Sequence, residues 1–161
     1  MTEIDRIIDQ LQREYDGDPW HGSPLKAILE GVSAAQAAAR PARSVHSIWE
    51  LVLHISAWKG EVRRRVSGAP AREPEEGDWP APGEQTPEHW REALQRLQTA
   101  QAQLLAAIRQ LPESRLYEPT SDPRNKPLGS GVSYYELLHG MVQHDVYHSG
   151  QIALLKKALE T

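Results

Sequence analysis

Four stretches of this 161-residue chain repeat apolar residues at intervals of three and four, and this periodicity constrains the fold more than any other feature of the sequence. Such spacing places the apolar side chains along one face of an α-helix. Three of the stretches open with a residue suited to capping a first helical turn, namely Ser47, Thr86 and Ser133. We predict long helices from near Thr2 to Gly17, from Ser47 to about Gly68, from Thr86 to Pro112, and from Ser133 to the C-terminus.

Shorter helical signals lie between the first two stretches. Ser23 and Pro24 fit the N-cap and first position of a short helix that ends at Gly31, and a further turn is expected in the segment SAAQAAA. Strand signals are weak, because β-branched and aromatic residues nowhere alternate with polar ones over five or more positions. The chain is therefore predicted to be all-α, a single domain over residues 1–161 built as a four-helix bundle.

Two long connections, residues 67–85 and 112–131, are rich in proline, glycine and charged residues. Loops of this length in a compact domain usually cover a functional site or are disordered. Trp79 in the first loop favours packing onto the bundle, because an indole buries a large apolar area. An ordinary anchoring contact would explain the tryptophan equally well.

Composition excludes several classes of function. The net charge of −4 is mild, and apart from residues 63–65 the basic side chains are scattered, so neither a nucleic-acid partner nor a membrane partner is expected. The N-terminus lacks the basic start and apolar run of a signal peptide, and no apolar stretch could cross a bilayer, which favours a cytoplasmic protein. Cysteine is absent, so any thiol chemistry would need a thiol from outside the chain.

The last helical stretch carries a pair of histidines among its apolar residues. His144 and His148 are four residues apart, so their imidazoles lie one turn apart on one face and can reach the same metal ion at about 2.0–2.1 Å. Core histidines held by hydrogen bonds are the alternative. His54, two turns into the second long helix, is the expected third ligand. The other histidines are interpreted as surface or local packing residues: His21, His46, His89 and His139.

Two segments carry a resemblance to a known family: SIWELVLHISAWKGEV around His54, and ELLHGMVQHDVYHSGQIALLKK around His144 and His148. With them the chain resembles the DinB-like superfamily, which includes YfiT-type metal-dependent hydrolases and low-molecular-weight-thiol S-transferases. The resemblance implies a four-helix bundle of up-down-down-up connectivity, one divalent metal ion (nickel or zinc) held by these three histidines, and frequently a homodimer. Members with known activity join a small thiol, such as bacillithiol, mycothiol or glutathione, to an electrophile or use it in isomerisation.

Three neutral imidazoles would leave a divalent ion with net positive charge and an open position, the arrangement of a catalytic site. The leading hypothesis is a small-thiol-dependent S-transferase that uses a metal-activated external thiol on a small-molecule substrate. One alternative is a metal-dependent hydrolase that uses metal-bound hydroxide. The other is a non-catalytic metal-binding dimeric bundle, whose ion only stabilises the fold.

Three polar residues near the histidine pair are candidate catalytic groups. Asp145 could orient an imidazole or, less well than a longer glutamate, act as a general base. Gln151 lies within about 20° of His144 on a helical projection, so it could hydrogen-bond a ligand or a substrate, or simply lie at the bundle end. Tyr147 is a possible proton donor or anion anchor, with ordinary packing as the alternative.

Overall fold

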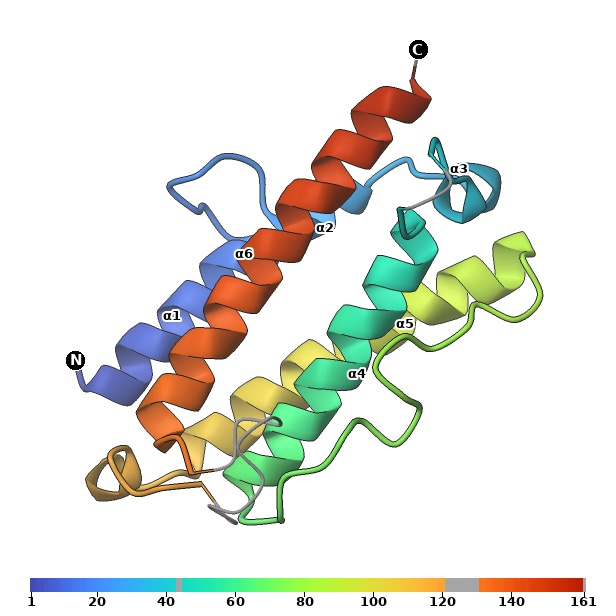
Figure 1. Ribbon diagram of the computed structural model, residues 1–161. Helices are drawn as coiled ribbons and strands as arrows, with labels where there is room; N and C mark the ends of the chain where they lie inside the picture. The colour runs from blue at the N-terminus through green and yellow to red at the C-terminus, as the bar shows by residue number, and fades with distance from the viewer. Residues whose placement is uncertain (43–44, 121–130, 161) are drawn as a thin grey trace.

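The computed structural model describes residues 1–42, 45–120 and 131–160 of the chain (Figure 1). Within these ranges the regular elements are α-helices and one 3₁₀ turn, η1, with a single isolated bridge between Pro119 and Ser133, which confirms the predicted all-α class. Part of the second long loop, residues 121–130, lies outside the described residues. The elements are α1 (Glu3–Asp16), α2 (Leu25–Leu29), α3 (Ala34–Ala38), α4 (Ile48–Val66), α5 (Pro87–Arg109), η1 (Glu113–Arg115) and α6 (Tyr134–Leu159).

Side chains cap the helices where the sequence predicts them. In α4 the Ser47 hydroxyl accepts the backbone N–H of Glu50 at 3.2 Å, and the Glu50 carboxylate accepts the N–H of Ser47 at 2.7 Å. The α6 helix begins with the same reciprocal pair, Ser133 and Glu136. These caps satisfy backbone donors that have no partner inside a helix.

The short helix α2 differs from its prediction. It begins at Leu25, with Pro24 as its N-cap and no side-chain cap, whereas the sequence placed the cap at Ser23. The reason is that Pro24 has an extended backbone, with ψ at 159°, and so lies outside the helix. The turn expected in SAAQAAA is confirmed as α3, which Ser33 and Gln36 cap.

Contacts between the long helices define their relative directions. The α4 and α5 helices run the same way, because the rings of Trp49 and Trp90 near their starts lie 5.1 Å apart and Lys59 bonds to Gln101 further along. The α1 and α6 helices also run together, since Nε2 of His139 lies 3.5 Å from a carboxylate oxygen of Glu3 near their starts. Ser149 and Glu14 form the corresponding contact further along α6 and α1. Figure 1 shows the two pairs running in opposite directions.

A polar layer interrupts the core of the described bundle. One cluster of buried apolar side chains lies around Trp49 and Trp90, and a second lies around Ile7 and Leu104. Between them in sequence, each long helix contributes a buried polar side chain: Glu14 from α1, Lys59 from α4, Gln101 from α5, and Asp145 and Ser149 from α6. The predicted histidine ligands come from α4 and α6 at this level of the bundle.

No helix among the described residues is both long enough and apolar enough to cross a membrane.

Candidate metal centre

The structure brings His54, His144 and His148 together between α4 and α6. Nε2 of His54 lies 3.0 Å from Nε2 of His144, and one nitrogen from each of the three rings lies within 4.8 Å of the others. Two ligands about 2.1 Å from one ion, at roughly tetrahedral or right angles, lie about 3.0–3.4 Å apart. The described geometry therefore suits a cluster that could hold a metal ion.

The loop between α4 and α5 orients His54. Nδ1 of His54 lies 2.6 Å from the backbone carbonyl oxygen of Asp78. A carbonyl oxygen can only accept a hydrogen bond, so Nδ1 carries the proton and Nε2 keeps a free lone pair. The Asp78 carboxylate in turn accepts the indole N–H of Trp58 at 2.7 Å, which ties the loop to α4.

Gln151 orients His148 in the same way. Its side-chain oxygen lies 2.6 Å from Nδ1 of His148, so Nδ1 donates and Nε2 is again free to bind a metal. The helical projection placed Gln151 nearest to His144. In the structure it reaches His148 instead, because a side chain three residues further along the helix lies one turn above the ring.

His144 is the least constrained of the three rings. Its Nδ1 is buried and makes no hydrogen bond to any described residue, and Oδ1 of Asp145, 3.8 Å away, is also without a hydrogen-bond partner. That separation is too long for a direct hydrogen bond. If Nε2 of His144 bound a metal, the ring proton would have to lie on Nδ1, facing Asp145.

Burial favours the neutral form of the His54 and His148 imidazoles. Removal from water lowers the pKa of His54 and lowers that of His148 to about 4, and the neighbouring histidines add to both effects. At neutral pH these rings are therefore unprotonated at one nitrogen, as metal ligands must be. The His144 side chain is 26% exposed, against 6% for His54, so the site opens toward solvent beside His144.

The His54 ring is one end of a stack of three flat rings. The indole of Trp79 lies on the His54 ring with centroids 3.9 Å apart and planes 9° apart, and His46 lies on the other face of the indole at 3.5 Å. This confirms that Trp79 packs onto the bundle and that His46 is a local packing residue. Trp79 is 37% exposed, whereas His54 is only 5% exposed, so the indole lies between the His54 ring and solvent.

The other predicted site residues lie in different surroundings. Asp145 is fully buried, and its Oδ2 pairs with the ammonium of Lys59, so its side chain points into the polar layer. Tyr147 is 65% exposed, with its ring edge-on to His148 at a centroid distance of 5.0 Å. Its hydroxyl group makes no hydrogen bond within the described residues.

The polar layer behind the site contains an unusual carboxyl group. Glu14 is buried and accepts a hydrogen bond from the Ser149 hydroxyl. Burial, reinforced by the negative charge of Asp145, raises the pKa of Glu14 to about 7. Sequence reasoning missed Glu14 and Lys59, because charged residues of a helix are ordinarily exposed, and it missed Asp78, because that residue contacts His54 through its backbone carbonyl.

Most of the chain is similar to one known protein family. A family model described as the DinB superfamily matches residues 9–152, a span that includes all three histidines and the loop residues Asp78 and Trp79. No curated protein and no solved structure shows a significant match.

Proposed function

The chain belongs to the DinB superfamily, and we propose that it is a metal-dependent enzyme. In this proposal His54, His144 and His148 hold one divalent ion, nickel or zinc. The observation that carries the proposal is the convergence of the three imidazoles. Nδ1 of His54 donates to the Asp78 carbonyl, and Nδ1 of His148 donates to the Gln151 side chain. In both rings Nε2 therefore faces the common centre.

The reaction that this site supports best is transfer of a low-molecular-weight thiol to a small electrophilic substrate. A divalent ion bound by neutral imidazoles would lower the pKa of a thiol at its open position and so supply a thiolate near neutral pH. Because the chain has no cysteine, this thiol comes from solution. The exposed side of His144 is the side from which it would enter.

Residues around the histidines have distinct proposed roles. Gln151 and the Asp78 carbonyl keep two rings in the tautomer that binds metal. Asp145 would accept the Nδ1 proton of His144, directly after a small shift or through a water molecule. Tyr147, exposed beside His148, would donate a proton or hold an anionic substrate group at the rim.

Transfer of a thiol suits the site better than hydrolysis does. Free water has a pKa of about 15.7 and a free thiol about 8.5, so the metal must lower the pKa of water much further than that of a thiol to supply a nucleophile near neutral pH. One oxygen of each of the carboxylates nearest the three rings is already engaged: Oδ2 of Asp145 pairs with Lys59, and Oδ1 of Asp78 accepts the Trp58 indole N–H. A hydrolase and a non-catalytic metal-binding bundle remain the rival functions.

The experiment compares turnover of small electrophiles with and without added bacillithiol, mycothiol or glutathione, using the metal-loaded protein and a His144→Ala variant. Thiol-dependent turnover that His144→Ala abolishes supports the proposal. Equal turnover without thiol identifies a hydrolase. A bound metal that raises the melting temperature, while no thiol changes the absorption spectrum of the nickel or cobalt form, identifies a non-catalytic bundle.

We also infer that the protein acts as a homodimer in the cytoplasm, as the superfamily resemblance and the sequence suggest. Light scattering coupled to size-exclusion chromatography would give the mass of the particle. A mass of one 18.1 kDa chain at micromolar concentration would contradict the dimer.

A further inference from the structure

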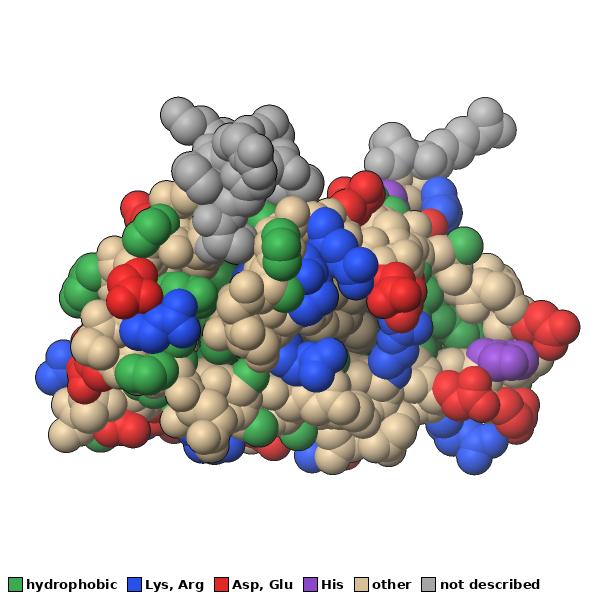
Figure 2. Space-filling view, turned by 90° about the horizontal axis from the view of Figure 1, so that it is seen from below, with side chains coloured by type: hydrophobic (Ala, Val, Ile, Leu, Met, Phe, Trp, Pro, Cys, Tyr) green, Lys and Arg blue, Asp and Glu red, His purple; other side chains and the backbone are tan. Residues whose placement is uncertain are grey.

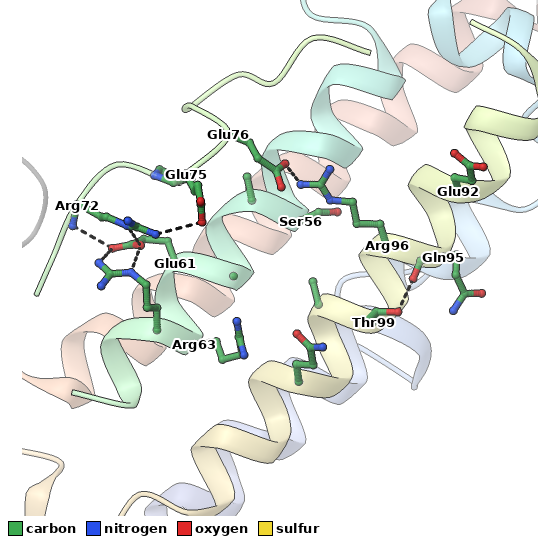
Figure 3. Close-up of a pocket in the computed structure, with 16 residues that line it drawn as sticks. Ser56, Glu61, Arg63, Arg72, Glu75, Glu76, Glu92, Gln95, Arg96 and Thr99 are labelled. Atoms are coloured by element: carbon green, nitrogen blue, oxygen red, sulfur yellow. Dashed lines mark hydrogen bonds and ion pairs between the residues drawn. The ribbon is translucent and has the colours of Figure 1, made fainter. Parts of the chain in front are cut away.

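A cavity of about 500 Å³ lies between α4 and α5, and the loop that joins these helices forms one of its walls (Figure 3). None of the three histidines lines it, so it is separate from the candidate metal centre. Figure 2 views the molecule from the side on which α4, α5 and this loop lie, and Lys and Arg side chains gather there around a recess.

Over the whole lining of this cavity four arginines accompany four glutamates, but on α4 itself two arginines, Arg63 and Arg64, accompany one glutamate, Glu61. The carboxylate of Glu61 is buried at the α4 wall, and three arginines of the described structure surround the carboxylate. Nε of Arg64 and Nε of Arg65 each donate to Glu61 at 2.8 Å, and Nε of Arg72 lies 3.9 Å away. Glu75, the other partner of Arg72, is largely exposed, so solvent screens it.

Arg63 adds a further positive charge to the same wall. Its side chain lines the cavity, and Figure 3 shows it between α4 and α5. No described residue forms an ion pair or hydrogen bond with its guanidinium group. Arg64, its neighbour, uses Nε and Nη2 in its hydrogen bonds to Glu61 and to the Pro70 carbonyl, which leaves Nη1 as a donor.

The facing wall from α5 supplies neutral polar groups at this end. Gln103 and Thr99 line the cavity opposite Arg63. The Thr99 hydroxyl donates its proton to a carbonyl of its own helix at 2.9 Å, so it can accept a hydrogen bond from a donor elsewhere on the ligand but cannot donate one to the anionic group. The negative side chains of α5 lie toward the other end, where Arg96 pairs with Glu76 from the loop and Glu92 lies one turn earlier.

We propose that this cavity binds a small organic anion whose carboxylate or phosphate group is held by Arg63 and Arg64. Guanidinium groups stay charged at all physiological pH values and present planar pairs of donors that match both anions. The volume of about 500 Å³ lies in the range of small-molecule pockets. The buried Glu61 carboxylate accepts two hydrogen bonds from Arg64, so Arg64 has little side-chain entropy left to lose on binding.

The test is a ¹H–¹⁵N NMR titration of the full chain with inorganic phosphate and, separately, with succinate, at ionic strength held constant with sodium chloride. The Arg63→Gln variant removes the unpaired guanidinium. Arg91→Gln is the matched control, because it also removes one positive charge from an exposed side chain, which pairs with Glu88 outside the cavity. Melting curves establish that both variants fold.

If Arg63 and Arg64 hold the anion, the chemical shifts of the Gly60 and Thr99 amides should change saturably with anion concentration. The affinity for the anion should be about tenfold or more weaker in Arg63→Gln and unchanged in Arg91→Gln. Binding of phosphate alone or of succinate alone would identify which anionic group the cavity accepts. Shifts that do not saturate with either probe, or that weaken equally in both variants, would overturn the proposal. So would binding that Arg63→Gln leaves intact, since it would locate the anion elsewhere.

Discussion

Nδ1 of His54 lies 2.6 Å from the backbone carbonyl oxygen of Asp78, so a residue of the α4–α5 loop sets the orientation of a candidate ligand on α4. The same loop residue is tied to α4 through the Trp58 indole, at 2.7 Å from the Asp78 carboxylate. The candidate metal centre thus depends on the loop as well as on the two helices that carry the histidines.

Removing the Asp78 carboxylate should weaken metal binding although it is not a ligand. In Asp78→Ala the loop loses its anchor to Trp58, so the carbonyl that orients His54 moves more freely. We expect zinc affinity to fall by about tenfold to a hundredfold, as for other residues that orient ligands. Trp58→Phe removes the same hydrogen bond from the other side and should reduce affinity similarly. Competition with a chromophoric chelator measures both. A normal affinity in either variant would show that this bond does not position His54.

Trp79 should slow the exchange of the metal with solvent. Its indole covers one face of His54, and Trp79→Leu would open that face to water. We expect removal of the metal by EDTA to become about tenfold faster, with a smaller change in equilibrium affinity. Trp20→Leu is the matched control, because Trp20 is 101% exposed and makes none of these ring contacts. Equal removal rates in the two variants would contradict a shielding role.

Glu14 should make stability depend on pH. In the folded protein burial raises its pKa to about 7, from an ordinary value of 4.5. Below pH 4.5 both states bind the proton. As pH rises from 4.5 to 7 the unfolded state loses it first, so the free energy of unfolding falls, by up to about 3 kcal/mol from this group, and then levels off.

Glu14→Gln cannot titrate, so this decline should be absent from the variant and should remain as the difference between wild type and variant. Urea unfolding of the metal-free proteins at pH 5 and pH 8 measures it. His148, whose pKa is lowered to about 4, acts in the opposite direction, because its contribution is lost as pH falls from 6.5 toward 4. It is present in both proteins and cancels in the comparison. An identical pH dependence in the two proteins would contradict the raised pKa of Glu14.

Lys59 should stabilise the fold mainly by compensating Asp145. Both side chains are fully buried and paired, so Lys59→Met would leave a carboxylate without its counter-charge. We expect a loss of about 3–5 kcal/mol in the free energy of unfolding. The double variant Lys59→Met with Asp145→Leu removes both charges and should recover most of that loss. Chemical denaturation tests this, and a double variant no more stable than Lys59→Met would show that the pair does not act as a unit.

The helices and the histidine cluster could be predicted from the sequence because both follow from local spacing. The Ser47 and Glu50 cap involves residues three apart, and His144 and His148 are neighbours on any α-helix. The pairing of His54 with them was also predicted, since a resemblance to known sequences accompanied the helical pattern. The caps and the His144–His148 pair need no knowledge of how the helices are aligned with one another, whereas the position of His54 opposite that pair does.

The polar layer and the loop contacts could not be predicted in this way. Lys59 is buried only because α4 places it at the level of Gln101 on α5 and Asp145 on α6, and helical periodicity says nothing about this alignment. Asp78 meets His54 across 24 residues through a backbone carbonyl, a group that every residue carries. The direction in which Gln151 points depended on a side-chain rotamer, which a projection does not contain.

Whether the three histidines bind one metal ion is tested by the metal content per chain, measured by elemental mass spectrometry, of the wild type, His54→Ala, His144→Ala and a His21→Ala control. His21 is exposed and lies outside the cluster. If His54, His144 and His148 form one site, the wild type and the control should hold close to one nickel or zinc ion per chain, and the His54→Ala and His144→Ala variants should hold little. Failure of the wild type to bind any divalent ion after reconstitution, or unchanged content in His54→Ala, would contradict the three-histidine site.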